Sequence, residues 1–229
     1  MSGALPKVYL VRHGETAWTI NRQHTGRTDI PLTERGECEA QELRARLRGL
    51  SFAQVLTSPL QRARRTGELA GFAECAHVDP DLMEWDYGAY EGRLTSDIRA
   101  ERPGWDLFED GCPGGETLLD VSTRAERVIA RVRALAGDVL LFAHMEILRV
   151  LAVRWIDQPA LRARRLFLET ASVSVLGYDH DLDEPVIRLW NDTDTDSAYA
   201  DQSVGGEARP SGDPDRHPAT RHRLLHQQA

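Results

Sequence analysis

The sequence contains no hydrophobic run long enough to cross a membrane. Its longest apolar stretches, such as Val139–Ala143, are far shorter than the roughly 20 residues that a spanning helix needs. The N-terminus also lacks the charged and then apolar segments of a secretory signal peptide. These absences predict a cytoplasmic protein with no membrane partner.

Cysteine is scarce as well. The three cysteines, Cys38, Cys75 and Cys112, are odd in number, widely spaced and in no metal-ligand pattern. They argue against a disulfide framework, and we expect reduced thiols with a structural role.

Lysine is nearly absent. Lys7 is the single lysine among 28 basic residues, and 36 acidic residues leave a formal net charge of −8. An acidic chain repels polyanions at long range, so we expect no nucleic-acid partner, and a phosphorylated ligand would need a local cluster of cations. Arginine suits such a cluster because its planar fork matches phosphate oxygens, although a bias in genome composition would explain the arginine preference equally well.

Apolar runs and helical periods alternate along the first 192 residues. Strands are expected at Lys7–Val11, Ala53–Thr57, Val139–Ala143, Ser172–Tyr178 and Val186–Trp190. Helices are expected from the N-cap Thr33 to Leu50, and over Leu60–Ala70, Glu116–Leu135 and Ile147–Ile156. This alternation predicts a single domain, a three-layer α/β/α sandwich with a mainly parallel sheet.

Three segments break the pattern. Gly14–Pro31 is expected to be a loop, and the excursion Ala73–Gly115, rich in Gly, Pro, Trp and Asp, is long enough to suggest a functional role. Residues Thr193–Ala229 have too few apolar side chains to offset the entropy of ordering, so we expect a disordered tail. The tail histidines lack the spacing and carboxylate support of a metal site; they are His217, His222 and His226.

Charged and imidazole side chains follow the predicted strands. Arg12 and His13 come directly after the first strand, and His144 comes directly after Val139–Ala143. Arg62 lies in the first turn of the helix that follows the second strand, where the helix dipole also favours an anion. Because ligands bind at the carboxyl ends of strands in open α/β sheets, these groups predict a pocket for a phosphoryl group.

Phosphoryl transfer in such a pocket requires a nucleophile and a proton donor. A neutral imidazole such as that of His13 can accept the phosphoryl group and split one displacement into two. The donor is expected in the excursion, where Glu84 is flanked by Met83 and Trp85, which would desolvate its carboxyl and raise its pKa. Asp86 is the second candidate.

Five ordered blocks between Lys7 and Asp192 resemble the histidine phosphatase, or phosphoglycerate mutase-like, superfamily. They are Leu10–Thr16, Thr25–Thr33, Thr57–Ala63, Gly114–Thr117 and Ala143–His144. The resemblance implies that His13 is the phosphorylated nucleophile and that Arg12, Arg62 and His144 complete the phosphate pocket. It also implies that Glu84 is acid and then base, that Asn21, Thr25 and Gly26 lie near the substrate, and that no metal ion or cofactor is needed.

Within the superfamily, Glu84–Gly92 and Trp105–Cys112 look most like the sedoheptulose-bisphosphatase type of sugar-phosphate phosphatase. The expected partner is therefore a small phosphorylated metabolite, and a homodimer is left open. His24, beside Thr25, either touches the substrate or lies on the loop surface.

One position departs from the family. The second histidine is usually followed by glycine, whereas this chain has Met145 and then Glu146. Glu146 is either an outward-facing acid at a helix start or a residue that tunes specificity toward an amino- or base-bearing phosphate.

Three functions remain in competition at this point. A phosphatase is favoured over a phosphoglycerate-type mutase, because the mutase branch carries an adjacent basic pair, and Arg93, Arg99 and Arg102 are scattered. The third is a phosphate-binding protein that has lost turnover, for which Met145 is the support.

Overall fold

The described part of the chain, residues 5–194 of a computed structural model, is built around a six-stranded sheet with the strand order β3-β2-β4-β1-β5-β6. The strands are β1 (Val8–Arg12), β2 (Gln54–Thr57), β3 (Ala76–Val78), β4 (Val139–Ala143), β5 (Val173–Tyr178) and β6 (Pro185–Asp192). The first four pair in parallel, and β5 and β6 add antiparallel. The mainly parallel sheet predicted from the sequence is confirmed.

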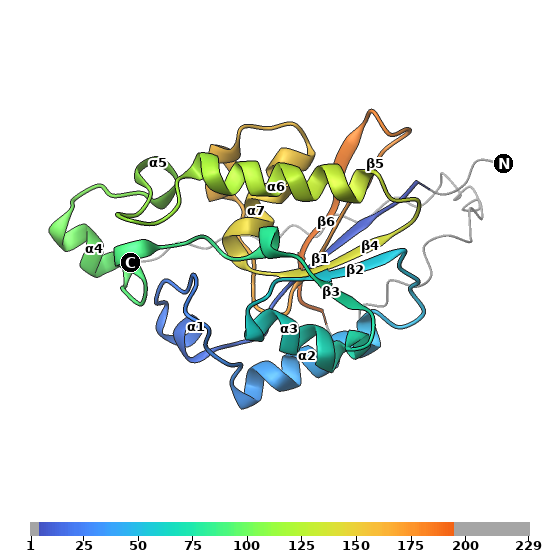
Figure 1. The fold of residues 1–229 in the computed structure, drawn as a ribbon, viewed down its shortest axis with the longest axis horizontal. Coiled ribbons are helices and arrows are strands. Elements are labelled where there is room, and N and C mark those ends of the chain that lie inside the picture. Colours follow the sequence, from blue (N-terminus) through green and yellow to red (C-terminus); the bar gives the residue numbers. More distant parts are fainter. Residues whose placement is uncertain (1–4, 195–229) are drawn as a thin grey trace, which may run out of the picture.

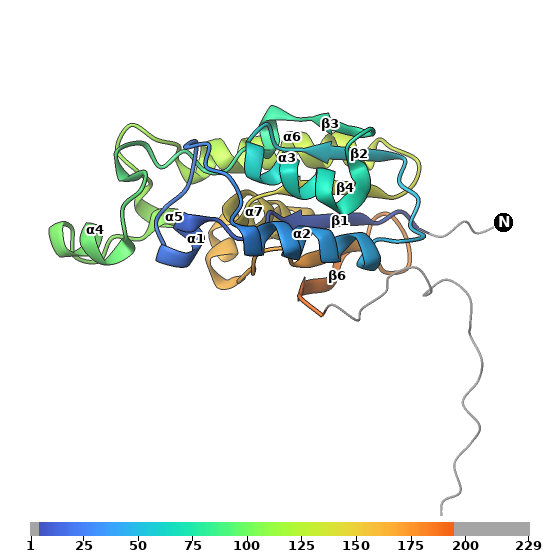
Figure 2. The ribbon, with the colours of Figure 1, turned by 90° about the horizontal axis from the view of Figure 1, so that it is seen from below.

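Helices cover both faces of this sheet (Figures 1 and 2). One layer contains α2 (Glu34–Arg46) and α3 (Gln61–Gly67), and the other contains α6 (Leu118–Arg133) and α7 (Met145–Trp155). Alternate residues of β1 face opposite layers, as the two-residue period of a strand requires. Leu10 packs in the core cluster that holds Ile147, and Val11 packs in the cluster that holds Leu43.

Threonine caps set where two of these helices begin. The Thr33 side chain accepts a hydrogen bond from the Gly36 amide at the start of α2, as predicted. Thr117 caps α6 and exchanges hydrogen bonds with Asp120, which forms a capping box. The predicted helix at Glu116 therefore begins two residues later, because Thr117 is the cap.

The irregular segments hold more structure than the sequence predicts. The Gly14–Pro31 loop contains α1 (Ala17–Asn21), and the excursion contains β3, α4 (Thr95–Glu101) and α5 (Leu107–Asp110). These elements are too short to leave a readable period. The predicted helix Leu60–Ala70 is also divided, because α3 gives way to a wider turn in which Gly71 has a φ of 99°. Figure 1 shows α1, α4 and α5 grouped beyond the carboxyl ends of β1 and β4.

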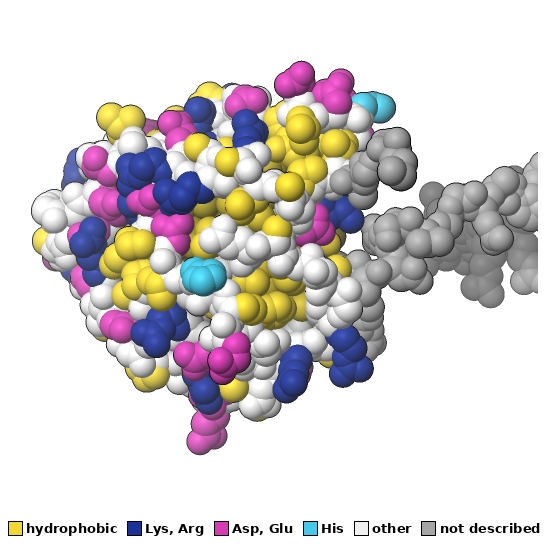
Figure 3. Space-filling model, turned by 45° about the vertical axis from the view of Figure 1, so that its right-hand side comes forward, with side chains coloured by type: hydrophobic (Ala, Val, Ile, Leu, Met, Phe, Trp, Pro, Cys, Tyr) yellow, Lys and Arg dark blue, Asp and Glu magenta, His cyan; other side chains and the backbone are white. Residues whose placement is uncertain are grey.

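Several expectations concern the surface and the ends of the chain. The three cysteines are free thiols. Between residues 5 and 194, no helix is both long and apolar enough to cross a membrane. Figure 3 shows acidic and basic side chains interspersed over the face in view. The predicted tail, from residue 195 onward, with its three histidines, lies outside the described residues.

Candidate active site

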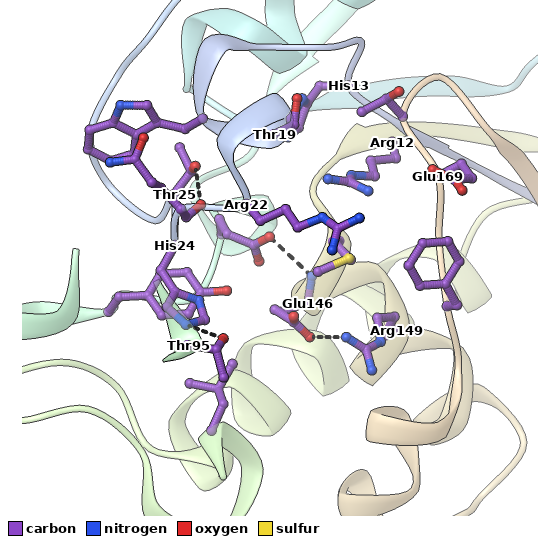
Figure 4. A pocket seen from close by; sticks show the side chains of 18 of the residues that line it. Arg12, His13, Thr19, Arg22, His24, Thr25, Thr95, Glu146, Arg149 and Glu169 are labelled. Atoms are coloured by element: carbon purple, nitrogen blue, oxygen red, sulfur yellow. Dashed lines mark hydrogen bonds and ion pairs between the residues drawn. The ribbon is translucent and has the colours of Figure 1, made fainter. Parts of the chain in front are cut away.

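A cavity of about 870 Å³ opens at the carboxyl ends of β1 and β4. Its walls come from α1 and the loop after it, from α5, from the first turn of α7 and from the segment that precedes β5 (Figure 4). Seven of the predicted residues line it directly, namely Arg12, His13, His24, Thr25, Glu84, Met145 and Glu146. Arg62 and His144 lie fully buried beneath that wall.

His13 is held in a single tautomer. Its Nδ1 lies 2.8 Å from the Gly14 carbonyl oxygen, and because a carbonyl only accepts, Nδ1 carries the proton. The lone pair is then at Nε2, on the opposite side of the ring. Burial and the charges of Arg62 and Arg12 hold the pKa of His13 well below its usual value. The imidazole is therefore neutral and nucleophilic at physiological pH.

Arg12 and Arg62 are oriented by backbone carbonyls. Arg12 donates to the carbonyl of Leu168, and Arg62 donates to the carbonyls of three loop residues, Thr25, Gly26 and Thr28. The Nε atoms of both guanidinium groups are buried and have no hydrogen-bond partner within the described chain. Buried donors are rarely left unpaired, so these two point to an anionic ligand.

His144 follows β4 and precedes α7, and its ring centroid lies 5.1 Å from that of His13. Its Nε2 is 2.7 Å from Ser58 Oγ, which itself accepts a weak hydrogen bond from the Leu60 amide. The Ser58 hydroxyl has no other acceptor for its proton within the described chain, so we assign that proton to the hydrogen bond with Nε2 and the ring proton to Nδ1. This Nδ1 is buried without a partner among residues 5–194 and is a further donor for a phosphoryl oxygen.

The Glu84 carboxyl lies at the N-terminus of α7. One oxygen accepts from the Glu146 amide at 3.1 Å, and the other accepts from the amides of Trp85 and Ile147. Burial raises the pKa of Glu84, and the amide hydrogen bonds oppose part of that rise. Asp86 is turned elsewhere, because it binds Arg27 at 2.8 Å and the Gly88 amide. The geometry therefore favours Glu84 as the proton donor.

Comparison with known proteins identifies the family. The family model described as histidine phosphatase superfamily (branch 1) matches residues 8–193. The chain belongs to this superfamily.

Two curated relatives of this histidine phosphatase are phosphatases by name. An acid phosphatase of Mycobacterium tuberculosis is 37% identical over 179 residues, which cover 76% of this chain and 87% of that protein. The sedoheptulose 1,7-bisphosphatase of Saccharomyces cerevisiae is 37% identical over 190 residues, covering 68% and 69%. A solved structure from Mycobacterium tuberculosis superposes with a TM-score of 0.77 at 34% identity, covering 81% of this chain and 97% of that one.

The residues predicted near the substrate are not all at the cavity. His24 and Thr25 line it, whereas Asn21 is exposed and lies outside the lining, which takes Thr19 and Arg22 from the same segment. Gly26 lies behind the wall, because its amide donates to Glu91 and its carbonyl accepts from Arg62. Helix α1, which the sequence did not reveal, decides which side chains of this segment face the cavity.

Met145 and Glu146 both line the cavity of this histidine phosphatase. Glu146 is 4% exposed and bonds Arg149 at 2.8 Å, so it is not an outward-facing acid. Burial raises the pKa of Glu146 to about 7, while Arg149 opposes the rise.

Sequence reasoning missed three residues in direct contact with the site, namely Ser58, Tyr87 and Arg149. Ser58 follows β2 directly, which is the same strand-end signal that identified His13 and His144. Tyr87 and Arg149 carry no comparable signal, because an irregular loop and a helix interior bring them to the cavity.

One group of described residues has the spacing of metal ligands, and it is remote from the cavity. Asp179, His180 and Glu184 lie at the turn between β5 and β6, and all three are exposed. His180 forms hydrogen-bonded pairs with its acidic neighbours, so the group is complete as an ordinary surface cluster.

Proposed function

We propose that this histidine phosphatase hydrolyses a small phosphorylated metabolite, without a metal ion, through a phosphohistidine on His13. The observation that carries the proposal is a set of unpaired groups around His13. His13 and Arg12 line the cavity, Arg62 and His144 lie buried beneath its wall, and Arg12 Nε, Arg62 Nε and His144 Nδ1 have no partner within the described chain. The two guanidinium groups supply positive charge that a metal ion would otherwise bring to phosphoryl transfer.

In the first step, His13 Nε2 attacks phosphorus, so that a P–N bond forms as the P–O ester bond breaks. The Glu84 carboxyl gives its proton to the departing oxygen, which leaves as an alcohol. Arg12, Arg62 and the His144 Nδ1–H stabilise the charge on the remaining phosphoryl oxygens. The raised pKa of Glu84 suits this acid role.

In the second step, a water molecule attacks the phosphohistidine. The Glu84 carboxylate accepts a proton from that water, the P–N bond breaks, and inorganic phosphate forms. His13 returns to the neutral tautomer that the Gly14 carbonyl holds. Acid and base are thus the same carboxyl group in its two protonation states.

The surrounding arginines support hydrolysis over mutase activity. Arg93 pairs with Glu101, and Arg102 pairs with Asp110, each at 2.6 Å. Neither is available as half of a basic pair that would grip a carboxylate substrate and retain the phosphoryl group. The cavity volume of about 870 Å³ suits a metabolite.

The test is phosphate release from a panel of sugar phosphates, nucleotides and phosphoglycerates, with and without a chelator. We expect chelator-resistant release that His13→Ala abolishes and that the exposed control His180→Ala retains. Acid-labile, base-stable labelling of the protein by substrate would identify the phosphohistidine. Phosphoryl relocation without release would identify a mutase, and the absence of turnover on the whole panel would identify a binding protein.

A further inference from the structure

Two buried polar groups beside Glu84 have no role in the steps above. The Tyr87 side chain is 3% exposed and lines the cavity, and its hydroxyl has no hydrogen-bond partner among residues 5–194. Glu146 is 4% exposed and lines the same cavity. Its Oε2 is bound by Arg149, whereas its Oε1 has no partner within the described chain. Because both side chains line the cavity, these two oxygen atoms are available to hydrogen-bond a ligand there.

Both groups are held in place by their neighbours. Arg149 fixes Glu146, and it is itself fixed by the Ala163 carbonyl and by the ring of Phe108, 5.2 Å away. The Tyr87 ring lies against that of His24 at 4.6 Å. Because neither side chain must be ordered on binding, each can contribute its full hydrogen bond to a ligand.

The first turn of α7 places Glu146 close to Glu84, and therefore close to the bond that is broken. The Glu146 amide donates to Glu84 Oε2, so the Glu146 side chain begins next to the proton donor. Tyr87 follows Glu84 by three residues in the chain, and its side chain lines the same cavity as Glu84 and Glu146. Atoms of the leaving group just beyond the ester oxygen would therefore meet Tyr87 and Glu146.

The chemistry of these groups favours a neutral hydroxyl over an ammonium ion. Arg149 already offsets the charge of Glu146 at 2.8 Å, and Arg12 adds a further positive charge to this part of the cavity. A buried ammonium would face both cations. The aromatic rings of Trp105 and Phe108, which also line the cavity, suit the C–H faces of a polyol chain or sugar ring.

We propose that Tyr87 and Glu146 form a specificity subsite for hydroxyl groups near the phosphoester, so that the substrate is a sugar or polyol monophosphate. Glu146 accepts a hydrogen bond from one hydroxyl, and Tyr87 donates to a second. This subsite rests on the proposed function, because it takes the cavity as the place where a phosphate ester binds.

The first test measures binding alone, at pH 8, in a His13→Ala background. Calorimetry compares glycerol 3-phosphate with n-propyl phosphate, which has the same three-carbon chain without hydroxyls. We expect glycerol 3-phosphate to bind at least about 10-fold more tightly, which is the lower end for a single hydrogen bond to a charged group. Tyr87→Phe and Glu146→Gln should each reduce this ratio. Glu126→Gln, an equivalent change at an exposed acid paired with Arg154, should leave it intact.

Equal binding of the two ligands, or a ratio that neither cavity variant lowers, would overturn the subsite. Tighter binding of ethanolamine phosphate than of glycerol 3-phosphate would overturn the hydroxyl assignment in favour of an ammonium group. Phosphate release by the unmodified enzyme is measured on the same ligands. Release without hydroxyl preference would refute the subsite and leave the phosphatase standing. Preferential binding without release would refute the phosphatase and retain the subsite.

Discussion

Replacement of Ser58 by alanine tests the assignment of the His144 proton. Ser58 is fully buried, and its hydroxyl is the partner of His144 Nε2 at 2.7 Å. Without that hydroxyl, keeping the proton on Nδ1 leaves Nε2 as an unpaired buried acceptor, which costs about 1–3 kcal/mol. Applied to the transition state, this cost corresponds to a loss of roughly 5- to 150-fold in kcat/KM.

The assay is steady-state phosphate release, combined with the free energy of unfolding from denaturant titration. Ser174→Ala is the matched control, because Ser174 is also fully buried and loses a hydrogen bond, with the Asn191 amide, on the far part of the sheet. We expect both variants to lose stability and Ser58→Ala alone to lose activity. If Ser58→Ala kept its kcat/KM, Ser58 would not set the tautomer of His144.

Three further changes test other parts of the site. In Glu84→Gln, turnover of alkyl phosphates should fall by about 10²- to 10⁴-fold. With p-nitrophenyl phosphate, whose leaving group needs no proton, the same variant should still give a burst of nitrophenolate in stopped flow before slow hydrolysis of the phosphohistidine. Absence of that burst would contradict the acid role. In Gly14→Ala, the new Cβ would lie 2.4 Å from the Gly36 carbonyl oxygen. We therefore expect the free energy of unfolding, measured by denaturant titration, to fall by about 1–3 kcal/mol. An unchanged denaturant midpoint would contradict the close packing of Gly14 against Gly36. The Glu146 carboxyl has a folded pKa of about 7 against an ordinary value of 4.5, so its stabilising contribution is complete below pH 4.5 and is lost as the pH rises to about 7. Between pH 4.5 and 7, the free energy of unfolding of the unmodified protein should fall by at most about 3 kcal/mol relative to that of Glu146→Gln. Parallel plots of unfolding free energy against pH for the two proteins would refute this.

Much of the fold could be predicted because the strongest patterns are local. The buried strand β4 is a continuous apolar run, and α6 repeats apolar residues on one face over its 16 residues. The short helices α1, α4 and α5 could not be predicted in this way, because packing against the cavity walls, rather than their own periodicity, stabilises them. The same limit explains why Asn21 was expected near the substrate and lies outside the cavity lining.

The position of a candidate site residue could be predicted where the end of a strand fixes it. His13 and His144 each follow a predicted strand, so the sequence places both at the carboxyl edge of the sheet, and the pairing of β1 with β4 then brings the two rings together. Tyr87 reaches the cavity through an irregular loop, and Arg149 reaches it from the second turn of α7. Their roles depend on three-dimensional contacts that no spacing encodes.

The arrangement of the two site arginines explains how an acidic chain can bind phosphate. Arg124 and Arg149 are neutralised by carboxylates, whereas Arg12 and Arg62 are held by backbone carbonyls and have no carboxylate at ion-pair distance within residues 5–194. A carbonyl orients a guanidinium group without cancelling its charge. Burial raises the pKa of the nearby Glu84, which weakens the tendency of that carboxyl to carry a negative charge beside the two arginines. The two positive charges therefore remain available to the ligand, and the net charge of −8 does not decide what this cavity binds.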